Sequence, residues 1–340
     1  MQDSVPAYFV VTRDMANDIA RISLLDEGLA PTDVSIEAPG LRDAVYLDGK
    51  LAVLAETSDD HGNFGVHVTL YDTKLAAISA PTRISDPFKM TSVPWHALYF
   101  RDGGAKLAVL RMYSDPSSVL SSTVPYLRSL DCSAPDATDV LPNSSDPLAR
   151  LPWGIGHILD LNRATDSVVY SMGLNRDKLY VVSLATNTKR EVITDPEYRQ
   201  TSLVGSAAIA SGTMMIMANA DVWYVDTSSL AVVGKALPGF KSAGRRVARG
   251  SAVLRSDGRA IVVVEERLSP GKSRLSGYDA ETLVPEWEVA AMPSPRGWRV
   301  CNDALVVCWW SNPGQILLLK DAVAIATQSS VGVEDVIPIE

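Results

Sequence analysis

Short apolar runs on either side of a tight turn recur along the whole chain. The segment 276–289, SGYDAETLVPEWEV, has a strand pattern, a turn, and a second strand pattern. Related turns are YDTKL around Asp72 and VDTSSL around Asp226, with weaker copies near positions 26, 131, 186 and 321. A turn-initiating Asp accepts backbone N–H bonds from residues about two positions later. We therefore predict a hairpin at each copy, with the Leu after the Asp beginning the next strand.

The spacing of these turns predicts the fold. Seven copies lie about 49 residues apart on average, and four-stranded propeller blades run about 40–50 residues. Between the copies, segments such as VYLDGKLAVLAE and VLRSDGRAIVVVEE place Gly and Asp between two apolar runs, which is typical of tight hairpins. No window has a sustained helical period. The pattern predicts an all-β protein, a seven-bladed β-propeller of four-stranded blades.

We expect one propeller domain over residues 1–340. The predicted blades are 1–39 plus 333–340, 40–87, 88–148, 149–198, 199–241, 242–293 and 294–332. The C-terminal strand, VEDVIPIE, would join the first blade and close the propeller, which removes an exposed sheet edge. Six or eight blades remain open, because the third unit contains a long insertion at 114–147.

Composition and charge restrict the partners. The net charge of −9 and the pI of about 5.0 argue against nucleic acid, which requires a basic surface. No segment approaches the roughly 20 consecutive apolar residues of a membrane helix. The N-terminus, MQDSVPAYFVVTR, has no signal-peptide pattern, so a cytoplasmic location is favoured unless a leader was removed. Cys132, Cys301 and Cys308 lack C-x-x-C spacing and are expected to be buried free thiols.

Candidate chemistry gathers where the first strand of each predicted blade begins. In propellers this end lies around the channel mouth, where ligands usually bind. The residues at these strand starts are Trp95, Trp153, Trp298, His96, His157, Arg42, Arg249 and Arg299. Aromatic walls with a few polar groups are typical of a small-molecule pocket. The alternative is that the Trp residues pack between blades and that the Arg residues form a solvated rim.

Each residue type suggests a role. We predict His96 and His157 as catalytic general acid or base groups. The three Trp side chains would be stacking walls, and Arg42, Arg249 and Arg299 would bind an anionic or carbonyl group of the substrate.

A metal site and a cofactor are not expected. His61 and His67 lie near Asp59 and Asp60, but their spacing matches no defined metal motif. The chain also lacks G-x-S-x-G, H-E-x-x-H and Walker A motifs.

The strand–YDAETL–strand unit resembles the blades of the YVTN and quinoprotein amine dehydrogenase β-chain-like superfamily of seven-bladed propellers. The resemblance covers the whole chain as a blade pattern. It implies either a subunit that docks onto a redox partner or an enzyme, such as a lactonase, cyclase or lyase, with His, Arg and Glu at the channel mouth. No family-specific catalytic motif is present, and the Glu, Asn and Asp metal ligands of the lactonases have no match.

Two functions follow as expectations. The first is a small-molecule-binding propeller, a cofactor-free cyclase, lyase or isomerase acting on an aromatic or hydrophobic substrate. The second is a non-catalytic interaction scaffold or a subunit of a larger complex, with a protein partner. The Trp, His and Arg residues favour the first, and the absence of a catalytic motif favours the second.

Overall fold

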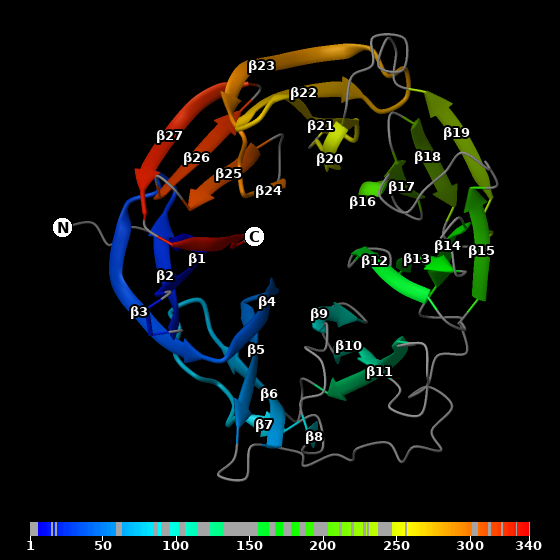
Figure 1. Ribbon diagram of the computed structural model, residues 1–340. Coiled ribbons are helices and arrows are strands. Elements are labelled where there is room, and N and C mark those ends of the chain that lie inside the picture. The colour runs from blue at the N-terminus through cyan, green and yellow to red at the C-terminus, as the bar shows by residue number, and fades with distance from the viewer. Residues whose placement is uncertain are drawn as a thin grey trace. The chain divides into compact units, whose positions relative to one another are not determined.

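The computed structural model of the protein is built from β-strands and turns (Figure 1). It describes residues 6–14, 16–17, 19–58, 63–83, 88–89, 96–101, 106–114, 123–131, 156–162, 167–172, 178–183, 188–193, 203–210, 213–218, 221–226, 229, 231–236, 247–255, 257–300, 305–311, 314–320, 322–330 and 332–339. Every regular element in these residues is a strand, which confirms the all-β prediction. Across the same residues, no helix has the length and apolar character needed to cross a membrane.

The chain divides into two compact units. Unit 1 comprises Met1–Trp153, Trp309–Ile316 and Ala326–Glu340, and unit 2 comprises Gly154–Cys308 and Leu317–Ile325.

Unit 1 contains three sheets. The first is β28 (Val333–Pro338), β1 (Pro6–Asp14), β2 (Ile19–Asp26) and β3 (Pro31–Pro39), in that order. The second is β4 (Leu41–Leu47), β5 (Lys50–Ser58), β6 (Asn63–Tyr71) and β7 (Thr82–Arg83), with β8 (Phe88–Lys89) also paired to β6. The third is β9 (His96–Arg101), β10 (Lys106–Ser114) and β11 (Thr123–Asp131).

Unit 2 contains three four-stranded sheets. They are β12 (Gly156–Asn162), β13 (Ser167–Met172), β14 (Lys178–Ser183) and β15 (Thr188–Ile193); β16 (Leu203–Ala210), β17 (Thr213–Ala218), β18 (Asp221–Asp226) and β19 (Val232–Ala236); and β20 (Val247–Leu254), β21 (Ala260–Ser269), β22 (Lys272–Asp279) and β23 (Pro285–Pro293). A last sheet has residues from both units: β24 (Gly297–Val300), β25 (Leu305–Ser311), β26 (Gly314–Lys320) and β27 (Val323–Ser329).

The predicted count of seven four-stranded blades is wrong, because only five of the described sheets have four strands. In the β4–β8 sheet the outer strand is in two short pieces. Thr82 pairs with Val68, while Phe88 pairs with Phe64, nearer the start of β6. A proline precedes each piece in the sequence, at 81 and 87, and proline cannot donate to a ladder. In the β9–β11 sheet three strands are described, and residues 132–148 of the predicted third blade lie outside the described residues.

The C-terminal strand belongs to the first sheet, as the sequence pattern predicted. β28 pairs antiparallel with β1, with Tyr8 opposite Pro338 and Thr12 opposite Val333. In Figure 1 the red β28 lies beside the dark blue β1. Residues from the two ends of the chain therefore hydrogen-bond within one sheet.

The first strands of successive sheets lie next to one another. In unit 1 the sequence of neighbours is β28, β4 and β9, and in unit 2 it is β12, β16, β20 and β24. The beginnings of these first strands carry the candidate residues. We call that end of a sheet the leading end, and the opposite end, where the Asp turns lie, the turn end.

The Asp turns at 26, 72, 226 and 279 form as predicted, with one difference, whereas the predicted copies near 131, 186 and 321 extend outside the described residues. The Oδ1 atom of Asp279 accepts the backbone N–H groups of Glu281 and Thr282, at 3.1 and 2.8 Å. The prediction that Leu283 begins the next strand is wrong, because β23 begins at Pro285. Leu283 closes the turn in the left-handed conformation, with φ of 57°, and is 2% exposed. Burial of the Leu side chain offsets a backbone strain of roughly 1–2 kcal/mol.

Left-handed leucines close two further Asp turns. Leu29 follows Asp26 and Leu75 follows Asp72, with φ of 65° and 62°. Both leucines are buried, at 0% and 4% exposed. The turn is therefore a repeated unit of an acidic cap and a buried leucine.

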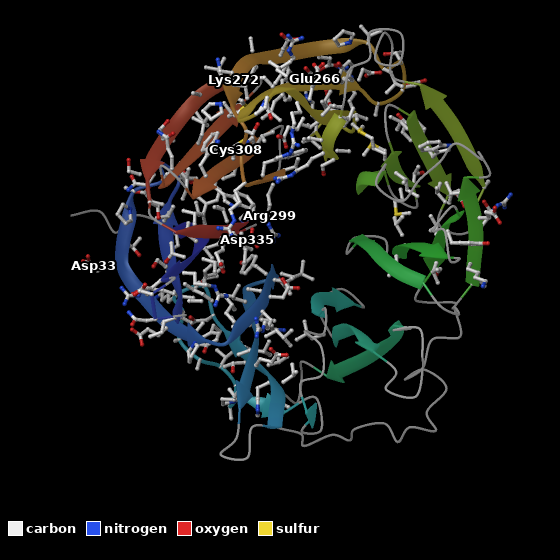
Figure 2. The ribbon with its side chains drawn as sticks, in the orientation of Figure 1. Asp33, Glu266, Lys272, Arg299, Cys308 and Asp335 are labelled. Carbon is white, nitrogen blue, oxygen red and sulfur yellow. The ribbon has the colours of Figure 1, made fainter. Side chains whose placement is uncertain are left out.

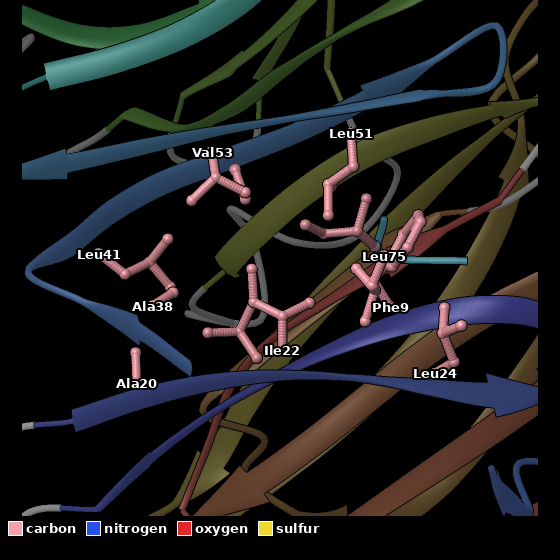
Figure 3. Packing of buried hydrophobic residues seen from close by; sticks show 12 residues of the cluster. Phe9, Ala20, Ile22, Leu24, Ala38, Leu41, Leu51, Val53 and Leu75 are labelled. Carbon is pink, nitrogen blue, oxygen red and sulfur yellow. The ribbon is translucent and has the colours of Figure 1, made fainter. Parts of the chain in front are cut away.

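Alternate strand residues build the core between sheets. Phe9, Ile22 and Leu24 of the first sheet pack with Leu51 and Val53 of the second, and Figure 3 shows this cluster. Such residues alternate with exposed ones because successive strand side chains point to opposite faces. This core fixes the strands whose leading ends carry the charged residues described below.

Candidate functional site

A buried carboxylate at a leading end is that of Glu265, in the second half of β21. It lies directly opposite Arg249, which follows a β-bulge near the start of β20. Arg249 Nε is 3.7 Å from Glu265 Oε2. The Glu265 side chain is 3% exposed and that of Arg249 is 41% exposed. The pair is therefore a buried carboxylate beneath an arginine that reaches solvent.

Two serine hydroxyls continue from the same carboxylate. Ser273 Oγ, near the start of β22, donates to Glu265 Oε1 at 2.7 Å. Ser294, just after β23, has its Oγ 2.7 Å from Ser273 Oγ. The backbone N–H of Ser294 donates to the Gly271 carbonyl at 3.0 Å, which fixes the residue against the β21–β22 turn. Ser273 is fully buried and Ser294 is half-buried, so the three side chains lead from the interior toward the surface.

The buried thiol of Cys308 lies close enough to the Glu265–Arg249 pair for both charges to affect its pKa. Cys308 lies on β25 and is 0% exposed, which confirms the expectation of a buried free thiol at this position. Burial raises the pKa of the Cys308 thiol, the negative charge of Glu265 raises this pKa further, and Arg249 opposes the shift. In Figure 2 Cys308 lies among packed side chains, whereas Asp33 on β3 points outward. Cys132 and Cys301 lie outside the described residues.

Strand β24, which neighbours β20, supplies an aromatic ring and a further cation. Trp298 and Arg299 are adjacent on β24 and both are half-buried. The Trp298 Nε1 atom is buried and has no hydrogen-bond partner among the described residues. Because β24 contacts β20, Trp298 and Arg299 lie on the strand next to the one that carries Arg249.

Unit 1 has its own pair of the same kind. Arg42 Nε donates to Glu56 Oε2 at 2.7 Å. The Arg42 side chain is 39% exposed and the Glu56 side chain is 2% exposed, close to the values for Arg249 and Glu265. Predicted anion-binding arginines of both units therefore rest on a buried glutamate from the neighbouring strand.

The predicted histidines lie at strand starts, as expected. His96 is the first residue of β9 and His157 is the second residue of β12. They belong to different units, and their side chains lie outside what the structure describes, as do Trp95 and Trp153. The catalytic roles of His96 and His157 remain predictions.

The structure describes one of the four residues that the sequence analysis considered, and did not favour, as a metal site. His67 lies on β6, while His61, Asp59 and Asp60 lie outside the described residues. In the part of the chain that the structure describes, no three His, Cys, Asp or Glu side chains cluster as metal ligands would.

Sequence reasoning missed Glu265, Ser273 and Ser294. One signal was present: the apolar run IVVV of β21 ends in two glutamates, 265 and 266, at positions where a buried strand continues. Charged residues are almost never fully buried unless paired. Two glutamates at the end of such a strand could therefore have indicated a paired site.

A pocket of about 480 Å³ lies at the turn end of unit 2, away from these residues. It is lined by Thr213, Tyr224, Gly258, Arg259, Ala260, Asp279, Ala280 and Glu281. Arg259 Nη2 contacts Asp279 Oδ2 at 3.0 Å and also pairs with Glu286. Its charge is thus compensated by two carboxylates, and the pocket follows from the packing of the repeated turns.

Tyr224 makes this pocket sensitive to high pH. Its hydroxyl donates to the Ala280 carbonyl at 2.5 Å. Burial, with a smaller effect of the Asp279 charge, raises the pKa of Tyr224 to about 12, above the usual value near 10. The neutral phenol therefore stabilises the fold below about pH 10, and this contribution is lost as pH rises toward 12.

We expect Tyr224→Phe to be less stable than the wild type at pH 8, by about 1 kcal/mol for the lost hydrogen bond. The difference should shrink above about pH 10. There Tyr224 ionises in the unfolded wild type but stays neutral in the folded one, which favours unfolding of the wild type, and the Phe variant has no such group. Urea unfolding of both proteins between pH 8 and pH 11.5 measures it. A difference that stays constant over this range would contradict the raised pKa of Tyr224.

The chain was compared with known proteins. No protein-family model and no curated protein matches it. Among solved structures, puromycin hydrolase is similar with a TM-score of 0.55 and 11% identity, over 98% of this chain and 55% of that one. Apo AztD from Citrobacter koseri has a TM-score of 0.49 and 13% identity, over 99% and 98% of the two chains. Dihydro-heme d1 dehydrogenase NirN has a TM-score of 0.45 and 16% identity, over 95% and 64%.

At these identities the likeness concerns the fold alone. This chain spans just over half the length of puromycin hydrolase. Together with the sheets described above, the likeness defines an all-β propeller. The resemblance to the YVTN and quinoprotein amine dehydrogenase group remains a prediction, because no family model matches.

Proposed function

We propose that this protein is a propeller that binds a small molecule with an anionic or carbonyl group at the leading end of the β20–β23 sheet. The observation that carries the proposal is Arg249, which is 41% exposed above a 3% exposed Glu265. Arginine is suited to carboxylate and phosphate because its planar guanidinium donates in a fixed fork. A guanidinium held by a glutamate beside Nε loses less freedom when its other donors bind a ligand.

The neighbouring strand supports an aromatic or hydrophobic ligand. Trp298 is half-buried on β24, next to β20. Aromatic side chains combined with a few polar groups are typical of small-molecule sites. A finer proposal from the sequence, that the protein is a cofactor-free cyclase, lyase or isomerase, depends on this site. A second one, that the C-terminal strand closes the propeller, depends on the β28–β1 pairing alone.

Titration calorimetry with benzoate, phenylacetate and indole-3-acetate tests the proposal. The variant Arg249→Gln/Glu265→Gln removes both charges together and leaves no unpaired buried carboxylate. We expect at least one acid to bind the wild type, and the variant to bind it at least about tenfold more weakly, as for a lost charge-assisted hydrogen bond.

The matched control is Arg21→Gln/Glu37→Gln. This pair is 3.4 Å apart, with side chains 55% and 63% exposed, and lies on the surface of unit 1. It should leave the affinity unchanged. Equal affinity of the Arg249 variant would exclude Arg249 as the anchor, and absence of binding by all three acids would exclude this ligand class. Arg42→Gln/Glu56→Gln tests the unit 1 pair in the same way.

A scaffold is the second candidate, favoured by one observation. Val323 and Ile325, on the edge strand β27, are 63% and 53% exposed on the same face. An apolar edge strand can pair with a strand of another protein. Val323→Lys/Ile325→Lys should then abolish a partner interaction while leaving acid binding intact.

A further inference from the structure

We propose that Ser294 is a nucleophile and that this leading end cleaves carboxylic esters. The inference rests on the proposed function, because Arg249 would hold an anionic group of the same substrate. The feature that carries it is the line of hydroxyls from Ser294 through Ser273 to the buried Glu265.

The two hydroxyl protons in this line have a fixed direction. Each serine hydroxyl has one proton to donate. The proton of Ser273 goes to Glu265 Oε1, at 2.7 Å. The 2.7 Å contact between the two serines therefore requires Ser294 to donate to Ser273. The lone pairs of Ser294 Oγ are left for an electrophile.

The carboxylate at the end of the line is kept in the interior without full compensation. Glu265 Oε2 is buried and accepts no hydrogen bond among the described residues, and Arg249 Nε is 3.7 Å from it. A buried carboxylate with an unsatisfied oxygen is costly. Such an arrangement is found more often where function requires it than where packing alone decides.

The line of hydroxyls in the β20–β23 sheet is not repeated at the corresponding positions of the β24–β27 sheet. In the next sheet, Ser330 follows β27 as Ser294 follows β23, and its N–H donates to the Gly314 carbonyl at 3.0 Å, as that of Ser294 does to Gly271. Two residues after Gly271 is Ser273, but two residues after Gly314 is Ile316, which is fully buried and apolar. Ser330 thus has the same backbone position, with the apolar Ile316 where the other sheet has the Ser273 hydroxyl.

The reaction balances with these groups and water. Ser294 Oγ bonds to the ester carbonyl carbon while its proton passes to Ser273 Oγ and the proton of Ser273 passes to Glu265 Oε1. The bond to the alcohol oxygen breaks, and the leaving alkoxide takes a proton back through the same line. Water then attacks the acyl group on Ser294, releases the carboxylic acid, and returns the proton to Ser294 Oγ. No redox partner is needed.

The substrate class follows from the neighbours of Ser294. The ester would carry a carboxylate or phosphate for Arg249, and Trp298 on the adjacent strand favours an apolar or aromatic portion.

A fluorophosphonate probe, which phosphonylates activated serines, tests the assignment on the full chain, with peptide mapping by mass spectrometry. We expect labelling at Ser294. Ser294→Ala should abolish it, and Ser330→Ala, the matched control, should leave it unchanged. Labelling of other serines only, or equal labelling in Ser294→Ala, would overturn the proposal.

Ser273 is a positioning residue, and its test separates relay from packing. With p-nitrophenyl acetate, Ser273→Ala should lower kcat about 100-fold with KM unchanged, as expected for loss of general-base assistance. A change in KM or in melting temperature without a change in kcat would assign Ser273 a packing role and overturn the relay. If the aromatic acids bind through Arg249 and Ser294 is not labelled, the ester-cleaving inference fails and the proposed binding function stands.

Discussion

Replacing Gly40 with Ala is expected to lower the free energy of unfolding by about 3 kcal/mol or more. Gly40 has a φ of 70°, and a Cβ atom there would overlap the Glu56 carbonyl oxygen. The carbonyl of the same glycine accepts the backbone N–H of Glu56 at 2.8 Å. The added methyl group would therefore have to separate β4 from β5 at the leading end, and the hydrogen bond would be lost with the packing. Urea unfolding of the two proteins measures the effect.

Gly49→Ala is the matched control in the same sheet. Gly49 has a φ of 76°, but nothing lies within 4 Å of a Cβ placed there. Its substitution should cost only the backbone strain, about 1 kcal/mol. The difference between the two variants then measures the close approach at Gly40. Equal losses in both variants would contradict the contact between Gly40 and Glu56.

The close approach at Gly40 recurs in the first sheet with the charges exchanged. Gly332 has a φ of 69°, and a Cβ there would lie 2.5 Å from the Arg13 carbonyl oxygen. Glu334, two residues after Gly332, lies on β28, and its Oε1 accepts from Arg13 Nε at 2.9 Å. Two residues after Gly40 the charge is reversed, because Arg42 lies on β4 and donates to Glu56. The leading end thus uses one backbone geometry with either charge order. Arg42 and Arg249 at this end each contact a buried glutamate, and the proposed anion binding would use this arrangement.

Local patterns allowed much of the fold to be predicted from the sequence. The Asp turn at 279 and the Asp48–Gly49 turn of β4–β5 depend on a few adjacent residues, and both form. The C-terminal strand was found because the first repeat lacked a strand and the last had one to spare, a comparison between copies. The arginines at strand starts were found in the same way, from aligned repeats.

Other features depend on contacts that no local pattern specifies. The left-handed conformation of Leu283 is stabilised by burial, which is a tertiary effect that overrides a backbone preference. The line from Ser294 to Glu265 joins the ends of three strands, and each member is an ordinary residue in its own segment. A β-bulge precedes Arg249, and a bulge alters which side chains face one another. The pairing of Arg249 with Glu265 could therefore be recognised only once the register of β20 and β21 was known.

Arg249→Ala is expected to lower the free energy of unfolding by about 2 kcal/mol, because it leaves the Glu265 charge buried without its arginine, beside the neutral Ser273 hydroxyl. Adding Glu265→Gln should recover most of this loss, since a neutral amide oxygen still accepts from Ser273 and no charge remains to be compensated. A double-mutant cycle compares the wild type, Arg249→Ala, Glu265→Gln and the double variant. The interaction energy that it gives for Arg249 and Glu265 should be about 1–2 kcal/mol.

The corresponding cycle for the surface pair Arg21 and Glu37 should give less than about 0.5 kcal/mol, because both side chains are exposed. A similar small value for Arg249 and Glu265 would mean that the glutamate does not depend on this arginine. Arg249 would then be a rim residue and not a held anchor. A large value would mean that the glutamate is tolerated in the core only with a cation above it. An anionic ligand on that cation would then occupy donors that the fold already holds in place.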